Sequence, residues 1–228
     1  MHLVLTERHC FYPDAQLYST PSDFGLYYED LALPGPEGRR LTGWRIPPAP
    51  NAPKRNVTVL HLHGNAQNMS AHLYGSYFLA LEGFRLITLD YRGYGASPGE
   101  PSLAGIIEDG DAAVRFLLEN PYGPDEPLVI FGQSMGAFTT AHLLPRFPAL
   151  KAAVLEAGLV SFRDLFLEAY PGAEVRVPDG FSTLEPLGRS AVPKLFIHGT
   201  ADTVVPLSHS QRLHQAAAGP KELMVLPG

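Results

Sequence analysis

Cysteine, tryptophan and methionine are scarce in this chain of 228 residues, with one, one and four copies respectively. The single cysteine, Cys10, excludes an intrachain disulfide, and no Cys/His cluster has the spacing of a zinc site. This composition fits a reducing compartment, so we expect the protein to act in the cytoplasm.

Long apolar runs and an excess of positive charge are lacking too. No stretch approaches the roughly 20 apolar residues of a membrane helix, so we expect no transmembrane segment in this sequence. The first ten residues carry Glu7, Arg8 and His9 where a signal peptide has an apolar run. The net charge of -6 disfavours nucleic acid as a partner. With 45% hydrophobic and 18% charged residues, the composition is that of a globular protein.

Apolar runs alternate with segments of helical spacing, which is typical of a mostly parallel sheet covered by helices on both faces. Two short runs joined by a turn predict antiparallel edge strands at residues 26–33 and 41–46. Six further runs predict parallel strands at residues 57–62, 84–89, 128–131, 152–155, 194–197 and 223–226. Crossover helices are predicted at residues 70–81, 102–118, 135–146 and 207–218.

Residues 158–190 break this alternation, because a plain crossover helix would be shorter and would hold fewer prolines. We therefore expect a single α/β domain over residues 1–228, with residues 158–190 inserted as a small cap. Four aromatic side chains of this segment are candidates either for the core or for an acyl pocket: Phe162, Phe166, Tyr170 and Phe181.

The strongest chemical signal is the sequence GQSMG at residues 132–136, between a predicted strand and a predicted helix. A sharp turn from strand to helix strains the backbone of Ser134, and Gly132 and Gly136 remove side chains that would collide with neighbouring elements. The alternative interpretation is a serine that caps a helix after a glycine turn. The strand-to-helix context favours Ser134 as a nucleophile on a sharp turn of this kind, which is called a nucleophile elbow.

A second signal, HGNAQN at residues 63–68, directly follows the predicted strand 57–62. A loop at the carboxyl end of a central strand lies at the rim where such sheets place their sites. An oxyanion hole needs two preorganised donors, and we expect the backbone N–H groups of Asn65 and Met135 to supply them. Taken alone, the segment is also compatible with an ordinary polar turn.

The third signal is HGTADTVVP at residues 198–206, after the predicted strand 194–197. An acid at this strand end can orient the imidazole that serves Ser134, and we assign that role to Asp202. Glu156, at the end of the strand 152–155, is a rival acid that we rank below Asp202. A structural role for Asp202 in its loop also remains open.

These motifs, with DYRGYGAS at residues 90–97, resemble in type and order the small-cap serine hydrolases of the α/β-hydrolase superfamily. The resemblance covers residues 26–228, and the similar proteins include human α/β-hydrolase-domain proteins, some of them acyl-protein thioesterases. It implies an eight-stranded sheet, a Ser-His-Asp catalytic triad, no metal or organic cofactor, and a small-molecule or acylated substrate with an ester or thioester bond.

In that superfamily the catalytic histidine follows the last strand by a few residues, usually after a Pro-Gly or Gly-Gly turn. This sequence ends at Pro227-Gly228, where the histidine is expected, and no final helix follows. We therefore expect a chain truncated before its catalytic histidine and inactive or nearly so. Among the histidines present, His209 is the first candidate for an internal base, whereas His198 is expected to brace its loop through hydrogen bonds.

Two function classes stay open: a serine hydrolase, and a catalytically silent protein that keeps the fold for binding. Within the enzyme class a serine peptidase is the runner-up, and a dehalogenase is disfavoured because its nucleophile would be an aspartate in place of Ser134. Arg92 could bind an anion, but we expect it to pair with a local carboxylate. Glu108, Asp109 and Asp111 are expected to form a solvated helix face.

Overall fold

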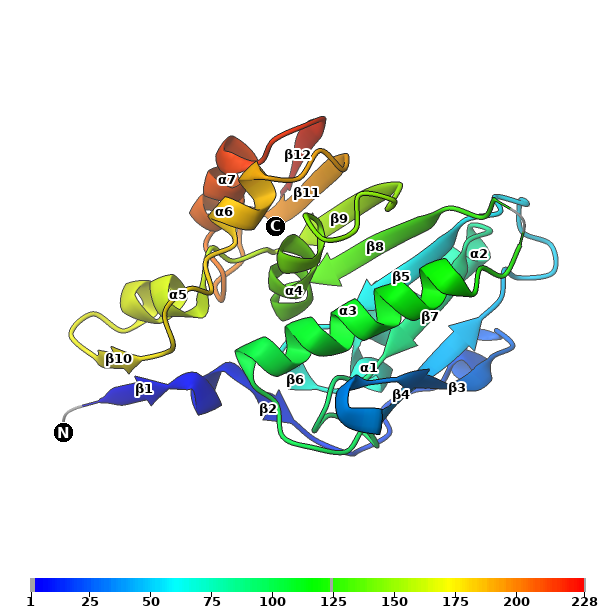
Figure 1. Cartoon of the computed structure of the whole chain (residues 1–228), viewed down its shortest axis with the longest axis horizontal. Coiled ribbons are helices and arrows are strands. Elements are labelled where there is room, and N and C mark those ends of the chain that lie inside the picture. The colour runs from blue at the N-terminus through cyan, green and yellow to red at the C-terminus, as the bar shows by residue number, and fades with distance from the viewer. Residues whose placement is uncertain (1–2, 124, 228) are drawn as a thin grey trace.

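The computed structural model describes residues 3–123 and 125–227, and an eight-stranded sheet forms its centre (Figure 1). The strands stand in the order β12-β11-β9-β8-β5-β7-β4-β3. Their bounds are β3 (Glu29–Pro34), β4 (Arg40–Ile46), β5 (Thr58–Leu62), β7 (Arg85–Leu89), β8 (Leu128–Gln133), β9 (Ala152–Glu156), β11 (Lys194–Gly199) and β12 (Lys221–Leu226). The α/β-hydrolase fold with its eight-stranded sheet is confirmed.

Pairing within the sheet matches the prediction in all but one respect. β3 is antiparallel to β4 and β4 to β7, whereas all the remaining neighbours are parallel. β4 lies between β3 and β7, so the expectation that both early strands are edge strands is wrong for β4. Gly43 permits the close approach, because a Cβ atom there would stand 2.5 Å from the carbonyl oxygen of Thr88.

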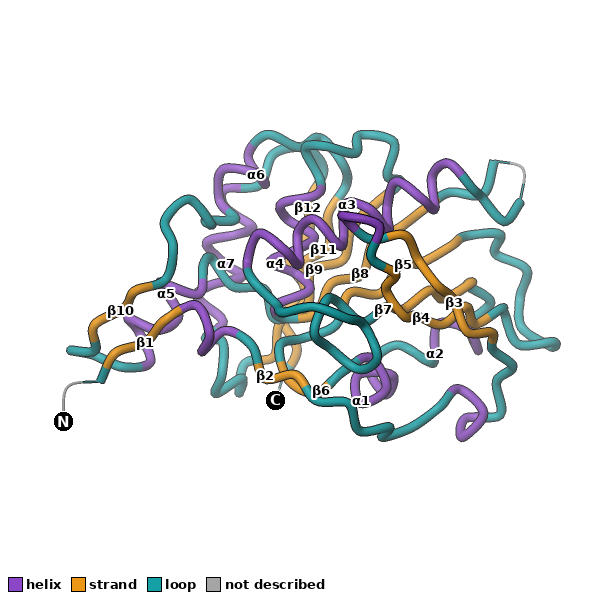
Figure 2. Tube along the Cα trace, turned by 60° about the horizontal axis from the view of Figure 1, so that its bottom comes forward, coloured by secondary structure: helices purple, strands orange, loops and turns teal. Residues whose placement is uncertain are grey.

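Helices cover both faces of the sheet (Figure 2). Three of the four predicted crossover helices form, as α3 (Leu103–Glu119), α4 (Met135–Leu143) and α7 (Leu207–Ala216). α3 and α4 pack on one face, over a core that contains Ile106, Val114 and Phe138. At 17 residues α3 is the longest of these, and no helix within the described ranges has the length and apolarity that a bilayer crossing requires.

The predicted helix 70–81 does not form as one element. It divides into α1 (Met69–His72), a 3-10 turn (Leu73–Gly75) and α2 (Phe78–Leu81). The backbone leaves the helical region at Ser76, with φ -138° and ψ -22°, which separates the 3-10 turn from α2. α1 and α2 cover the second face of the sheet, where Met69 and Leu73 pack with β4 and β7 side chains.

Residues 158–190 form α5 (Phe162–Ala169), β10 (Glu174–Arg176) and α6 (Leu184–Gly188). As expected, this segment is not one continuous crossover helix. β10 pairs in parallel with β1 (Val4–Thr6), so α5 and β10 project to one side together with the N-terminal segment (Figure 1). Of the four aromatic residues named in this segment, Phe162 and Phe166 belong to the core, Phe181 packs against it, and Tyr170 is 49% exposed. Whether the segment acts as a cap stays a prediction.

Candidate active site

Ser134 occupies the sharp turn between β8 and α4, with φ 52° and ψ -110°. A positive φ is rare for a residue with a side chain, and here the flanking glycines make the turn possible. A Cβ atom on Gly132 would lie 2.3 Å from the Gly136 carbonyl oxygen, and one on Gly136 would lie 1.8 Å from that of Leu62. The predicted placement of Ser134 on a strained strand-to-helix turn is confirmed.

Backbone hydrogen bonds hold this turn at both ends. The Ser134 N–H donates to the Glu156 carbonyl oxygen at 2.8 Å, and the Ser134 carbonyl accepts from the N–H of Phe138 at 3.1 Å. Met135 is the first residue of α4, a position whose N–H has no acceptor within the helix. The positive end of the α4 dipole and this N–H therefore lie next to Ser134, where negative charge would develop during attack.

The loop that follows β5 lies beside the serine turn. β5 and β8 are parallel neighbours with Leu62 opposite Gly132, so both loops leave the same end of the sheet. The Nδ1–H of His63 donates to the carbonyl oxygen of Gly64 at 2.7 Å. Since the C=O and N–H of a trans peptide point in opposite directions, this bond fixes the direction of the Asn65 N–H.

The next peptide of the loop is fixed as well. The Asn65 carbonyl accepts from the N–H of Tyr12 and from the hydroxyl of Tyr94, both at 2.9 Å. Tyr12 belongs to β2 (Tyr12–Pro13), which pairs with β6 (Ala66–Gln67) inside the loop. These contacts make the loop rigid, which an oxyanion hole requires; the convergence of the Asn65 and Met135 N–H groups on one point stays a prediction.

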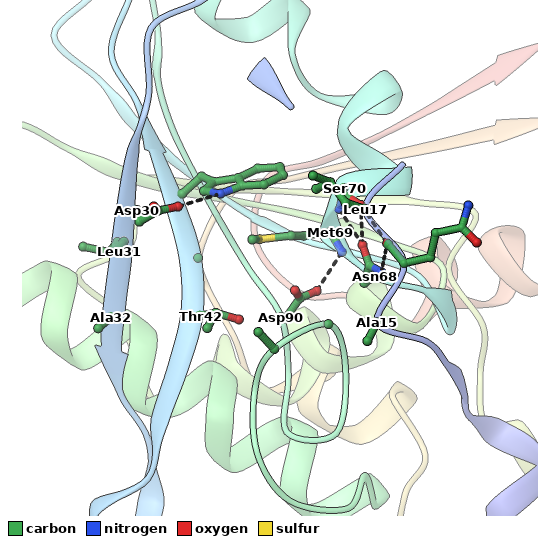
Figure 3. A pocket seen from close by; sticks show the side chains of 15 residues that line it. Ala15, Leu17, Asp30, Leu31, Ala32, Thr42, Asn68, Met69, Ser70 and Asp90 are labelled. Atoms are coloured by element: carbon green, nitrogen blue, oxygen red, sulfur yellow. Dashed lines mark hydrogen bonds between the residues drawn. The ribbon is translucent and has the colours of Figure 1, made fainter. Parts of the chain in front are cut away.

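His63 sits in an aromatic and acidic environment that the sequence did not reveal. Its ring is 4.7 Å from the Tyr91 ring and 5.1 Å from that of Tyr94, and its Nε2 lies 3.4 Å from Asp90 Oδ1. The buried Asp90 also accepts the N–H of Met69 at 2.7 Å, at the start of α1 (Figure 3). In the sequence, the only sign that His63 and Asp90 meet was that each directly follows a predicted strand.

A cavity of about 440 Å³ lies next to Asp90, and Figure 3 shows side chains that line it. Trp44 and Met69 line it with apolar surface, and Asp90 and Asn68 add polar groups. Ser134 is not among its lining residues, so this cavity does not by itself define a substrate pocket.

Asp202 lies in the loop after β11 with its side chain 22% exposed. Its Oδ1 accepts the N–H groups of Val204 and Val205 at 2.8 and 2.9 Å, and its Oδ2 is 3.5 Å from Nε2 of His198. These bonds shape the loop, as the structural alternative anticipated, and its part in catalysis stays a prediction. Glu156 is engaged elsewhere, since its Oε1 accepts from Gln133 at 3.1 Å.

His209, the candidate for an internal base, and His198 both have other partners. The ring of His209 is buried, accepts the Val160 N–H on Nδ1 at 3.0 Å, and has Nε2 3.1 Å from Glu168. With both nitrogens engaged, His209 is not available as a base for Ser134. His198 contacts Ser210 and the Val205 carbonyl, both at 2.7 Å, and so braces its loop as expected.

Arg92 forms the local ion pairs that we expected. Its guanidinium lies 2.7 Å from Asp109 and 3.0 Å from Glu108. The expectation of a solvated acidic face is wrong for Asp109, which is fully buried, and for Asp111, which is 9% exposed. Arg92 supplies both a charge and a backbone N–H to Asp109, and Arg146 pairs with Asp111, so both carboxylates are compensated.

The sheet order and the turn at Ser134 define an α/β-hydrolase, and comparison with known proteins agrees. A family model described as "Serine aminopeptidase, S33" matches residues 53–182. The Escherichia coli K12 protein YfhR is 34% identical over 224 residues, covering 95% of this chain and 77% of its own. The chain therefore belongs to the S33 family of α/β-hydrolases.

Another similar sequence and a solved structure agree with this fold. The Arabidopsis thaliana α/β hydrolase domain-containing protein WAV2 is 32% identical over 219 residues, 87% of this chain and 70% of its own. An esterase of Pyrococcus furiosus superposes with a TM-score of 0.77 at 22% identity, covering 95% of this chain and 90% of the esterase. At that identity the likeness shows the fold alone.

Proposed function

We propose that this protein is a serine hydrolase that cleaves carboxylic ester or thioester bonds through an acyl-enzyme on Ser134. The observation that carries the proposal is the backbone of Ser134, held at φ 52° by two glycines that tolerate no side chain. A fold seldom keeps such a strained residue without a use for it. Ser134 is also only half-buried, which leaves part of the residue accessible to a substrate.

The reaction follows from the groups around this turn. The Ser134 oxygen attacks the substrate carbonyl while a base takes its proton, and the N–H groups of Asn65 and Met135 stabilise the oxyanion. The tetrahedral intermediate expels the alcohol or thiol, which receives the proton from the base. Water then attacks the acyl-enzyme by the same route and releases the acid. Residues 158–190 act as a cap over the substrate.

The base in this proposal is a histidine that Asp202 orients, as in a Ser-His-Asp triad. His209 and His198 do not fit that part, because both ring nitrogens of each are engaged. Asp202 rather than Glu156 is the acid in this proposal: Glu156 Oε1 accepts from Gln133 at 3.1 Å, whereas Oδ2 of Asp202 has a contact of 3.5 Å with His198, longer than an ordinary hydrogen bond.

A fluorophosphonate probe and a panel of p-nitrophenyl esters and acyl thioesters test the proposal. Ser134→Ala should abolish labelling and lower turnover by about 10³-fold or more, whereas Ser22→Ala, an exposed serine, should leave both unchanged. Unchanged labelling in Ser134→Ala would contradict the proposal. A wild type that neither labels nor turns over any substrate would favour a catalytically silent binding protein.

A serine peptidase is the second candidate, and the family description favours it. A puromycin-hydrolysing peptidase of Mycobacterium tuberculosis also shares the fold, with a TM-score of 0.67 at 22% identity over 89% of this chain and 35% of the peptidase. The same triad serves both reactions, so aminoacyl p-nitroanilides belong in the panel. Faster turnover of the anilides than of the matched esters would select the peptidase.

A further inference from the structure

His72, the last residue of α1, lies against the loop that carries Asn65. A Cβ atom on Gly64 would be 2.9 Å from Cε1 of the His72 ring, so the loop backbone rests on that ring. Nε2 of His72 is also 3.0 Å from the carbonyl oxygen of Ala66. The ring thus contacts the loop on both sides of Asn65.

The other ring nitrogen faces the serine turn. Nδ1 of His72 is 2.7 Å from Oε1 of Gln133, the residue that precedes Ser134. The amide nitrogen of Gln133 donates to Glu156 Oε1 at 3.1 Å, which sets the orientation of the amide and leaves its oxygen toward His72. Glu156 also accepts the Ser134 N–H with its backbone carbonyl. One ring therefore connects the loop after β5 with the turn after β8.

Both acceptors are carbonyl oxygens, so His72 must donate. A neutral imidazole has one N–H and serves one acceptor at a time, whereas an imidazolium serves both. Burial and the neighbouring His63 lower the pKa of His72 below its usual value; Gln133, Ala66 and Asp90 act in the opposite direction. Near neutral pH the ring carries one proton between the two oxygens.

We propose that His72 is a positioning residue, whose ring lies between Ala66 and Gln133 and, by donating its one N–H to either carbonyl oxygen, holds the oxyanion loop and the nucleophile turn at a fixed separation. The inference rests on the proposed function of Ser134. Transition-state stabilisation depends on the distance from the nucleophile to the oxyanion donors, and a displacement of about 1 Å can cost about 10²-fold in rate. Tyr94 adds a second connection between the two segments. Its hydroxyl donates to the Asn65 carbonyl and lies 3.8 Å from the sulfur of Met135, but a thioether sulfur is a weak acceptor.

Three substitutions separate the two contacts. His72→Phe keeps a flat ring and removes both ring nitrogens. His72→Asn can place an amide N–H near the position of Nδ1, toward Gln133, and His72→Gln can place one near Nε2, toward Ala66. His142→Phe is the matched control, because His142 is also a half-buried histidine at a helix end but packs against Phe138, away from the turn.

In the full chain His72→Phe should lower kcat for a short p-nitrophenyl ester about tenfold and change KM by less than about twofold, because ground-state binding does not use these contacts. His72→Asn or His72→Gln should recover part of the loss, and His142→Phe should change neither constant. Phe, Asn and Gln variants with equal losses would mean that the ring acts by shape alone, and the proposal would fall. A His72→Phe variant whose kcat is within about twofold of wild type would also overturn the proposal.

A double-mutant cycle with Gln133→Leu completes the test. If His72 acts through Gln133, the losses of kcat in His72→Phe and Gln133→Leu should not multiply in the double variant, since groups that act as a unit are not additive. Losses that multiply overturn the inference. The same cycle can be measured by urea unfolding, which needs no activity. Coupling between the two changes in unfolding free energy would establish the contact. If the wild type then neither labels nor turns over substrate, the proposed function would be contradicted although the contact stands.

Discussion

Gly136 shows at the scale of single residues why the serine turn admits so few sequences. A Cβ atom at this position would overlap the carbonyl oxygen of Leu62 at 1.8 Å, and backbone cannot move aside as a flexible side chain would. Gly136→Ala should lower the free energy of unfolding by about 3 kcal/mol or prevent folding. Urea denaturation measures this change. Gly188→Ala, with its closest backbone atom at 3.4 Å, is the control and should stay within about 0.5 kcal/mol of wild type.

His142 gives the protein a specific sensitivity to acid. Burial lowers the pKa of His142 from 6.5 to about 4. Because the folded pKa lies below the unfolded value, the stabilising neutral form is complete above pH 6.5 and is lost as the pH falls toward 4. His142→Phe should therefore reduce the decrease in unfolding free energy between pH 7 and pH 4.5, by at most about 3 kcal/mol. An equal decrease in both proteins would contradict this origin.

The residues that local patterns could predict are those whose chemistry depends on their immediate neighbours. Ser134 between two glycines, at a strand end, is such a residue, and the structure places it as expected. The contacts of His63 and the burial of Asp109 were beyond prediction, because both depend on partners far along the chain. For Asp109, the partner Arg92 was identified from the loop, but a helix pattern cannot tell a buried compensated carboxylate from an exposed one.

At the scale of elements, prediction was good where hydrophobic periodicity is strong. All eight strands of the sheet form near their expected positions, and the helices 102–118 and 207–218 appear as α3 and α7. Prediction failed for the segment 70–81, where the backbone leaves the helical region at Ser76 within an apolar pattern that predicts one helix. The sequence could not predict the pairing of β1 with β10, since a strand of three residues carries no periodicity and its partner is remote in sequence.

That pairing gives an element-scale prediction. Leu5 in β1 is 5% exposed and belongs to the main core, whereas Leu3 just before it is 45% exposed. Leu5→Ala should lower the free energy of unfolding by about 2–4 kcal/mol, the usual range for a buried leucine, and Leu3→Ala by less than about 0.5 kcal/mol. Urea denaturation of the two variants decides it. Equal, small effects would mean that β1 does not pack as described.

The acid assignment concerns two neighbouring elements, because Glu156 ends β9 and Asp202 lies in the loop after β11. Asp202→Ala should lower kcat by about 10³-fold, and Glu156→Ala by about tenfold through loss of the Gln133 contact. Ester turnover of the two variants measures the difference. The reverse order would assign the acid to Glu156.

For the whole molecule, the proposed triad has a direct consequence. A serine hydrolase without its histidine base keeps only the contribution of the oxyanion hole and binding, about 10³-fold over water. We expect ester turnover well above that level, and turnover at that level would mean that no histidine serves Ser134.

The central claim is a covalent acyl-enzyme on Ser134, in a chain whose S33 family membership fixes the fold but not the substrate. Intact mass spectrometry after reaction with a fluorophosphonate, followed by peptide mapping, tests it most directly. The account predicts a single adduct on the Ser134 oxygen, absent in Ser134→Ala and formed at least about tenfold more slowly in His72→Phe. An adduct on another residue, or one that survives in Ser134→Ala, would contradict it.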